Sequence, residues 1–217
     1  MSKTFAIIGD SYSSYEGYVP EGYFSWYTPH GNECENDMPS VDMTWWKLLA
    51  SEKNLELVMN CSFSGSAISY SGYPDFPVSL KTSSFVERMK VDLGEKRGKD
   101  KAPDYLFVFG GTNDFWAGAP LGKVKYSDFT ESDMKFFAPA FCYLLEYLKE
   151  WNPTTKIYNL LNDEITSPIR QIMEEACSHY DIELIKLTDV AKENGHPNKY
   201  GMRAIADQIE AVMKKSE

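Results

Sequence analysis

The sequence predicts an α/β fold with a five-stranded parallel sheet and helices on both faces of that sheet. Five short apolar segments, each typical of a buried strand, alternate along the chain with amphipathic helical segments. Connections between parallel strands are right-handed crossovers, so the intervening helices cover both faces of the sheet. The 217 residues contain no internal repeat and no linker-like change of composition, so we expect one domain over residues 1–217.

The individual elements follow from the spacing of the apolar residues. The strands are expected at residues 5–8, 55–59, 104–109, 156–161 and 182–187. The helices are expected at residues 42–54, around 85–89, and over the apolar stripes at 136–148, 169–180 and 202–213. Asp42 is placed as the N-cap of the first helix, and Ser167 with Pro168 as the N-cap and first turn of the fourth. Pro139 lies within the third stripe, so that helix either kinks at Pro139 or starts there.

Composition and charge exclude several classes of protein. A formal net charge of −10 and the lack of a Lys/Arg stripe argue against nucleic acid and anionic lipid surfaces as partners. No apolar segment is long enough to span a membrane, and no signal-peptide pattern follows Met1, so we expect a cytoplasmic protein. Cys34, Cys61, Cys142 and Cys177 lack metal-ligand spacing, so we expect reduced thiols and no metal site.

Residues 12–41 form a long segment without helical or strand periodicity, and it is rich in aromatic side chains. Loops of this length in a compact domain are often functional. Tyr12, Tyr15 and Trp26 from this segment, with Trp116 after the third strand, are therefore candidates for lining a substrate groove. The alternative is a lid packed on the edge of the sheet, with the aromatic side chains as its own small core.

Four segments with chemically useful groups stand at the ends of expected strands or just before the last helix. Ser11 follows the first strand, Gly65 the second and Asn113 the third, while His196 precedes the last helix. A parallel sheet brings these segments to one edge, where open α/β folds bind ligands. Acyl transfer needs a nucleophile, a base beside it, and donors aimed at the developing oxyanion. Ser11 and His196 supply the first two; the N–H groups of Ser11 and Gly65 and the Asn113 amide supply the donors.

These blocks, in this order and strand context, resemble the SGNH/GDSL hydrolase (esterase/lipase) superfamily, which is named for its Ser, Gly, Asn and His blocks. The matching residues are Gly-Asp-Ser at 9–11, Gly65, Gly-Thr-Asn-Asp at 111–114, and His196-Pro197. The resemblance extends from the first strand to the last helix. It implies a three-layer α/β/α sandwich of flavodoxin-like type and esterase activity without a metal or organic cofactor. It also implies the catalytic and oxyanion-hole roles given above to Ser11, Gly65, Asn113 and His196.

The third catalytic group departs from the family pattern. The family usually has Asp three residues before the catalytic His, where this chain has Glu193. Three alternatives stay open: Glu193 as the acid, Asp189 reaching across the loop, or a Ser–His dyad whose imidazole is oriented by backbone carbonyls. Of the other two histidines, His30 is the rival base, and His179 lies late in a helix, where a structural role is expected.

We therefore expect a serine esterase that hydrolyses short-chain acyl esters, such as acetyl groups on carbohydrates, through an acyl-enzyme on Ser11. The aromatic loop motivates the carbohydrate or other small-molecule ester as substrate. An acyltransferase, or a long-chain lipase or thioesterase, would use the same residues. A non-catalytic, flavodoxin-like ligand-binding domain is the alternative from a different class.

Overall fold

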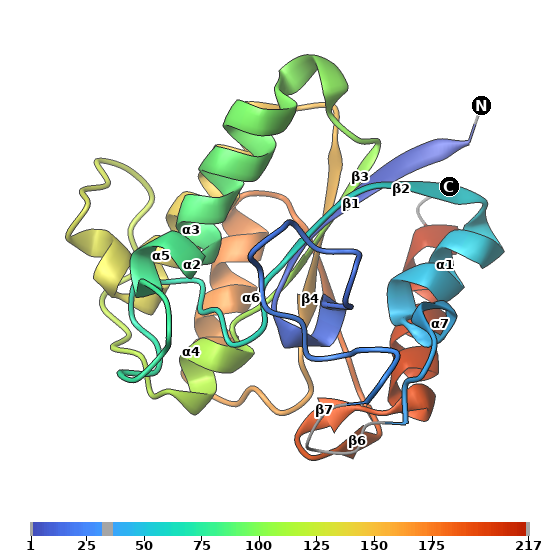
Figure 1. The fold of residues 1–217 in the computed structure, drawn as a ribbon. Coiled ribbons are helices and arrows are strands. Elements are labelled where there is room, and N and C mark those ends of the chain that lie inside the picture. The colour runs from blue at the N-terminus through green and yellow to red at the C-terminus, as the bar shows by residue number, and fades with distance from the viewer. Residues whose placement is uncertain (1, 32–36, 216–217) are drawn as a thin grey trace.

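The computed structural model describes residues 2–31 and 37–215, and its centre is a five-stranded parallel sheet (Figure 1). The strands lie side by side in the order β2-β1-β3-β4-β5. Their bounds are β1 Lys3–Gly9, β2 Leu55–Ser62, β3 Tyr105–Phe109, β4 Lys156–Leu161 and β5 Glu183–Lys186. The predicted parallel α/β fold is confirmed, and β1 lies between β2 and β3, so the chain just after β1 is flanked by the ends of both of these strands.

Alternate side chains of the strands face two separate apolar cores, as the twofold period of a strand requires. In β1, Phe5 and Ile7 face one core, whereas Ala6 and Ile8 face the other. All four side chains are fully buried. A strand with both faces buried is apolar at every position, which is why residues 5–8 read as a continuous apolar run.

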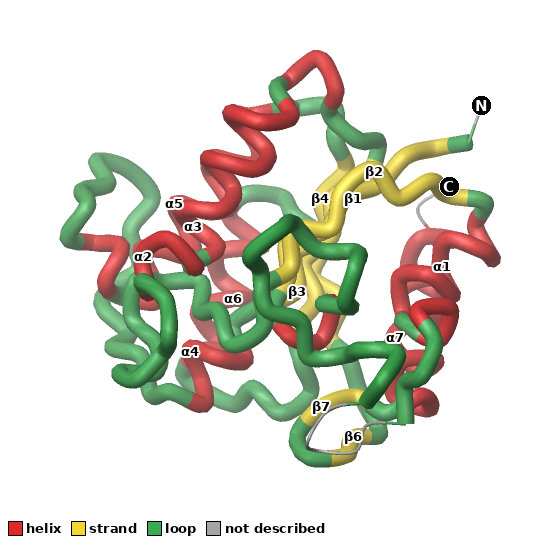
Figure 2. Tube along the Cα trace, in the orientation of Figure 1, coloured by secondary structure: helices red, strands yellow, loops and turns green. Residues whose placement is uncertain are grey.

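Helices cover both faces and complete the three layers (Figures 1 and 2). Helices α1 (Trp45–Lys53) and α7 (Lys199–Lys215) pack on one face. Helices α3 (Phe85–Arg88), α5 (Phe137–Trp151) and α6 (Ile169–His179) pack on the other, with α3 continuing as a π-helical segment over Met89–Arg97. Two short helices that the sequence did not predict, α2 (Leu80–Ser83) and α4 (Thr112–Trp116), lie in segments expected to be irregular.

Three helix starts differ from the predictions. Thr44, not Asp42, is the N-cap of α1, and its hydroxyl accepts from the Lys47 N–H at 3.4 Å; Asp42 lies one turn earlier, in a 3₁₀ turn. The cap of α6 is Pro168 and not Ser167, so that helix begins one residue later than expected. Helix α5 starts at Phe137, two residues before the predicted start at Pro139, and Pro139 lies in its first turn, where its missing N–H leaves no hydrogen bond unmade.

The buried aromatic side chains of the long segment after β1 belong to the same apolar core as one face of the sheet, α1 and α7, and not to a small core of their own. Tyr12, Tyr15, Tyr27 and Met38 are buried together against α1 and α7. A backbone bridge joins Tyr15 to Tyr27, and the Tyr27 hydroxyl donates to the Pro197 carbonyl at 2.7 Å. The segment is therefore tied to the loop that carries His196, which lies far along the chain.

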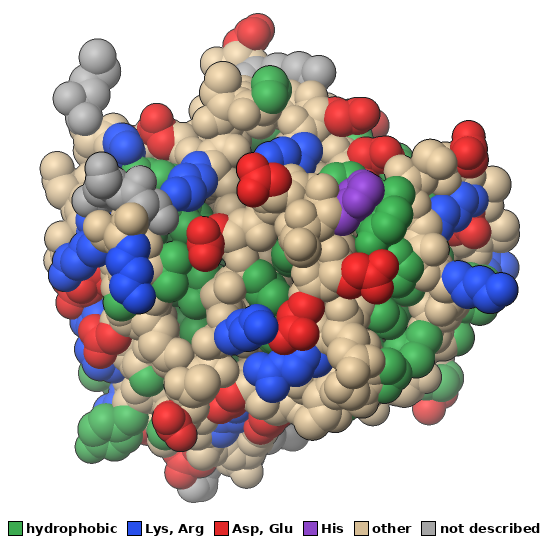
Figure 3. All heavy atoms as spheres, turned by 180° about the vertical axis from the view of Figure 1, so that it is seen from behind, with side chains coloured by type: hydrophobic (Ala, Val, Ile, Leu, Met, Phe, Trp, Pro, Cys, Tyr) green, Lys and Arg blue, Asp and Glu red, His purple; other side chains and the backbone are tan. Residues whose placement is uncertain are grey.

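Charged side chains of both signs lie on the surface (Figure 3), and the described cysteines are buried. Figure 3 shows acidic and basic side chains interspersed over the rear face of the molecule. Cys61, Cys142 and Cys177 are free and buried, and the fourth, Cys34, lies outside the described residues. Within residues 2–31 and 37–215, none of the helices combines the length and apolar character needed to cross a bilayer.

Candidate active site

Ser11 stands directly beyond the carboxyl end of β1, at the start of a 3₁₀ turn over Ser11–Ser13. The Asp10 carboxylate caps this turn by accepting from the Tyr12 N–H at 3.0 Å. Gly9 is required for the close packing beneath the turn, because a Cβ at this position would lie 2.6 Å from the Ser62 hydroxyl oxygen. The strand, the glycine and the cap together hold the Ser11 backbone in one conformation.

His196 lies on a small hairpin before α7, formed by β6 (Lys192–Glu193) and β7 (His196–Pro197). Asn194 and Gly195 form its turn with positive φ angles of 49° and 75°. The His196 Nε2 atom lies 2.9 Å from the Ser11 hydroxyl oxygen. On the other side of the ring, Nδ1 lies 3.0 Å from the Asn194 carbonyl oxygen. Since a carbonyl can only accept, Nδ1 carries the proton, and Nε2 is left to accept from Ser11.

The hydrogen-bond partner of Nδ1 bears on the three alternatives for the third catalytic group. The Glu193 and Asp189 side chains are exposed, and the atom that meets Nδ1 is the Asn194 backbone oxygen. Glu193 is opposite His196 in the hairpin, yet its side chain is exposed, and the hydrogen bond at Nδ1 is made with the Asn194 carbonyl. The geometry therefore favours a Ser–His dyad oriented by a backbone carbonyl. The rival base, His30, is exposed in the long loop.

Burial sets the protonation state of the imidazole. The His196 side chain is among the buried polar groups, and burial lowers its pKa from 6.5 to about 4, against the opposing effect of the Asn194 carbonyl. A low pKa keeps the ring neutral at neutral pH. A neutral imidazole with a free lone pair on Nε2 is the form that can accept a proton from Ser11.

Aromatic rings surround the imidazole. The Trp26 ring is stacked on it, with centroids 3.6 Å apart and planes 8° apart. The rings of Tyr12 and Trp116 meet it edge to face at 5.4 and 5.9 Å. The Tyr12 hydroxyl also donates to the Gly195 carbonyl at 2.7 Å, which fixes the hairpin turn.

Asn113 and Gly65, the other two residues predicted to donate to an oxyanion, both have defined conformations. The Asn113 Nδ2 atom donates to the Ser66 carbonyl at 3.0 Å and lies 3.5 Å from an Asp10 carboxylate oxygen. The Tyr73 hydroxyl donates to the Asn113 Oδ1 atom at 3.1 Å, so the amide orientation is determined by both of its ends. Gly65 has a φ of 80°, which favours glycine, and a Cβ there would lie 2.5 Å from the Phe76 ring.

Two buried carboxyl groups brace this region. Asp114 accepts from the Ile68 and Ser69 N–H groups at 2.7 and 3.2 Å, which joins α4 to the loop after β2. Burial raises the pKa of Asp114 to about 6 and that of Asp10 to about 7, although backbone N–H groups at both sites act in the other direction. Asp10 braces its own turn, whereas Asp114 braces the loop after β2.

Arg88 is a buried residue of this region that sequence analysis did not single out. Its guanidinium donates to the Gly9 carbonyl at 3.0 Å and to the Ser66 hydroxyl at 2.9 Å, and it also contacts the Cys61 carbonyl. The guanidinium thus links the end of β1, the end of β2 and the loop that carries Gly65. A single arginine at the end of α3 carries no sequence signal for such a role, and the same is true of Tyr73.

The four residues predicted to line a substrate groove have different environments. Tyr12 and Tyr15 are buried, with 0% and 3% of their surface exposed, so they support the loops instead of lining a groove. Trp26 is partly buried on the His196 ring. Trp116 is 39% exposed and borders the His196 turn, since a Cβ on Gly195 would lie 3.3 Å from its ring. Trp116 therefore remains a candidate for substrate contact.

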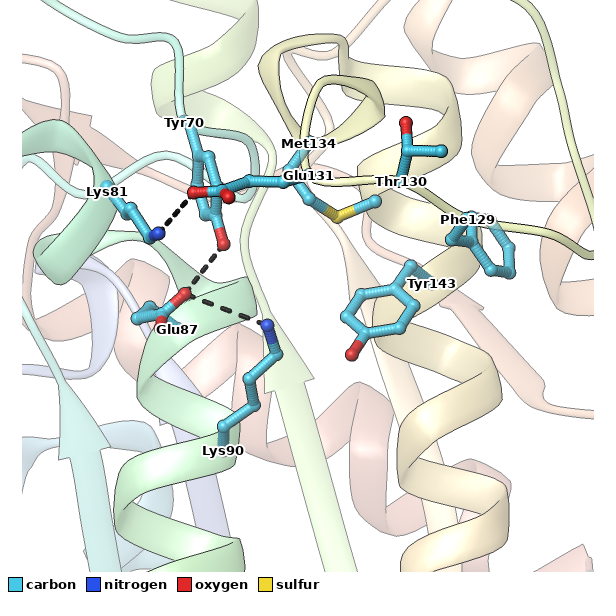
Figure 4. A pocket seen from close by; sticks show the side chains of 9 residues that line it. All are labelled: Tyr70, Lys81, Glu87, Lys90, Phe129, Thr130, Glu131, Met134 and Tyr143. Atoms are coloured by element: carbon cyan, nitrogen blue, oxygen red, sulfur yellow. Dashed lines mark hydrogen bonds and ion pairs between the residues drawn. The ribbon is translucent and has the colours of Figure 1, made fainter.

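A pocket of about 240 Å³ lies elsewhere, between α3, α5 and the segment before α5 (Figure 4). Two lysines and two glutamates at its rim pair with each other: Lys81 with Glu131, and Lys90 with Glu87 at 3.7 Å. The Tyr70 hydroxyl also donates to Glu87, at 2.6 Å. The pocket includes neither Ser11 nor His196, and its charged groups already satisfy one another, so the candidate site remains at the edge of the sheet.

The fold and site together define a three-layer α/β protein with a serine–histidine pair at the carboxyl edge of a parallel sheet. The family model described as GDSL-like Lipase/Acylhydrolase matches residues 3–213. The chain therefore belongs to the GDSL-like lipase/acylhydrolase family, as the resemblance in its sequence blocks indicated. The comparison with curated proteins gives no match.

Solved structures support the same assignment. The chain is 38% identical to a protein described as a GDSL-like lipase from Bacteroides ovatus ATCC 8483, with a TM-score of 0.90 and coverage of 99% of each chain. A protein of the same description from Bacteroides uniformis ATCC 8492 is also 38% identical, with a TM-score of 0.88 and coverage of 99% of this chain and 96% of that one. A family two carbohydrate esterase from Clostridium thermocellum in complex with cellohexaose shares the fold at 17% identity and a TM-score of 0.65; the match covers 99% of this chain and 64% of the esterase.

Proposed function

We propose that this protein is a serine esterase in which Ser11 and His196 act as a catalytic dyad. The observation that carries the proposal is the 2.9 Å contact between the Ser11 hydroxyl oxygen and Nε2 of a buried, neutral imidazole. A nucleophile within hydrogen-bond reach of a base that is itself oriented by a third group is the signature of covalent acyl transfer. Here the third group is the Asn194 carbonyl.

The proposed reaction begins when the Ser11 oxygen attacks the ester carbonyl carbon while its proton passes to Nε2 of His196. The carbonyl oxygen becomes an oxyanion, which the N–H groups of Ser11 and Gly65 and the Asn113 amide stabilise. The bond to the alcohol then breaks, and Nε2 returns the proton to the departing oxygen. A water molecule attacks the acyl-enzyme with His196 again as base, which releases the acid and restores Ser11.

Two observations support a short acyl group attached to a carbohydrate or similar alcohol. The Phe76 ring packs closely against Gly65, which limits the room for an acyl group beside this proposed oxyanion donor. Trp116 presents an exposed indole next to the His196 turn, and indole faces pack well against sugar rings. The carbohydrate esterase that shares this fold was solved with cellohexaose, which makes acetylated sugars the first substrates to test.

Labelling with a fluorophosphonate probe tests the nucleophile, with Ser11→Ala as the matched control because it removes only the hydroxyl. We expect covalent labelling of the unmodified protein and none of the variant. Hydrolysis of p-nitrophenyl acetate, butyrate and octanoate then tests the acyl size, and kcat/KM should fall with chain length. Absence of labelling, or an active Ser11→Ala variant, would contradict the esterase; a preference for octanoate would contradict only the short acyl group.

A further inference from the structure

The imidazole of His196 has an unusual environment for a catalytic base. Its Nδ1 atom meets a neutral backbone carbonyl and not a carboxylate, while its face is covered by the Trp26 ring at 3.6 Å with planes 8° apart. Proton transfer from Ser11 turns this ring into an imidazolium in a buried site. A buried cation is costly unless something compensates its charge. In a catalytic triad the carboxylate compensates the charge of the imidazolium. In this protein another group must do so.

The stack is held in place by backbone contacts on both sides. The backbone N–H of Trp26 donates to the Ser14 hydroxyl at 2.8 Å, and that hydroxyl donates to the Ser11 carbonyl at 3.1 Å. The next residue, Tyr27, is anchored through its hydroxyl to the Pro197 carbonyl at 2.7 Å. Trp26 is thus tied to the turn that carries the nucleophile and to the residue that follows the base.

The face of an indole carries negative electrostatic potential and attracts a cation, and Trp is the strongest such partner among the side chains. The attraction increases as the pair is removed from water, and here His196 is buried and Trp26 is partly buried. It acts on the imidazolium formed in the transition state more than on the neutral imidazole of the resting enzyme. An interaction that is stronger in the transition state raises kcat without changing KM in proportion.

We propose that Trp26 is a positioning residue that stabilises the His196 imidazolium through its ring face, in the place of the carboxylate of a catalytic triad. This inference rests on the proposed esterase function and deepens it. It also assigns Trp26 a role other than the wall of a substrate groove that its loop position predicted. Trp26 acts through His196 and needs no contact with the substrate.

The test replaces Trp26 by 5-fluoro-, 5,7-difluoro- and 5,6,7-trifluorotryptophan, inserted at this position alone. Each fluorine withdraws charge from the ring face and changes the shape of the ring very little. With p-nitrophenyl acetate at neutral pH, we expect kcat to fall stepwise by about tenfold over the series, with KM changing less than about twofold. A residue that only fills space would not respond to the number of fluorines.

Trp151 provides the matched control. It lies at the end of α5, is 4% exposed, and packs in the core on the other side of the sheet. Trifluorotryptophan at Trp151 should leave kcat unchanged. A flat series at Trp26, or an equal loss at Trp151, would overturn the inference while leaving the esterase intact. An unmodified protein that neither hydrolyses esters nor reacts with the fluorophosphonate would remove the esterase itself and the inference with it.

Discussion

The most discriminating prediction concerns Glu193→Gln, which removes one charge from the hairpin and keeps nearly the same shape. In the family pattern this position belongs to the catalytic acid. In this chain the Glu193 side chain is exposed and the Asn194 carbonyl is bonded to Nδ1 of His196. We therefore expect Glu193→Gln to retain almost all of the activity.

The magnitude follows from elementary electrostatics. Even about 5 Å from the imidazolium, an exposed unit charge in a water-like dielectric contributes about 0.8 kcal/mol, or about fourfold in rate. A true triad carboxylate contributes far more, since neutralising one lowers kcat by about 10⁴-fold in a serine protease. A dyad and a triad therefore predict kcat values for Glu193→Gln that differ by about three orders of magnitude.

The assay is steady-state hydrolysis of p-nitrophenyl acetate by Glu193→Gln, with two comparisons. Asp189→Asn tests the second alternative and should also stay within about fourfold of the unmodified protein, because the Asp189 side chain is exposed too. His196→Ala should lose about 10³-fold or more, as removal of a catalytic base does elsewhere. A loss of 100-fold or more in Glu193→Gln, with an unchanged melting temperature, would refute the dyad and restore Glu193 as the acid.

Three further predictions address the rest of the site. Because burial lowers the pKa of His196 to about 4, kcat/KM should stay near its maximum down to about pH 5 and fall as the pH drops through 4. A histidine with an ordinary pKa would already lose about 90% of the rate at pH 5.5, so the pH profile of kcat/KM distinguishes the lowered pKa from the ordinary one. Tyr73→Phe removes the donor to Asn113 Oδ1 and should lower kcat by about tenfold with little change in KM, which steady-state kinetics would reveal; equal kinetics would show that the amide needs no such support. Asp10→Asn keeps an acceptor for the Tyr12 N–H and should melt within a few degrees of the unmodified protein. Asp10→Ala loses this cap and should lose about 1 kcal/mol of stability. Identical melting curves for Asp10→Ala and the unmodified protein would contradict the capping role.

Much of the fold could be predicted because its elements have local signatures. Residues 5–8 are apolar throughout since both faces of β1 are buried, and α5 and α6 carry their apolar residues at helical spacing. Helix starts have weaker local signatures. The N-cap of α1 is Thr44 and not the predicted Asp42. Both residue types can cap a helix, and the 3₁₀ turn over Val41–Met43 places Thr44 at the helix start.

The sequence by itself determined where Ser11, Asn113 and His196 stand relative to the strands and the last helix, since strand ends and turn residues have patterns that a single segment carries. The tertiary structure alone decided what surrounds His196. The Asn194 carbonyl at Nδ1, the Trp26 ring on its face and the buried Tyr12 beside it depend on loop conformations. Such conformations are stabilised by contacts between residues far apart in the chain, such as the hydrogen bond from Tyr12 to Gly195, and local periodicity carries no record of them.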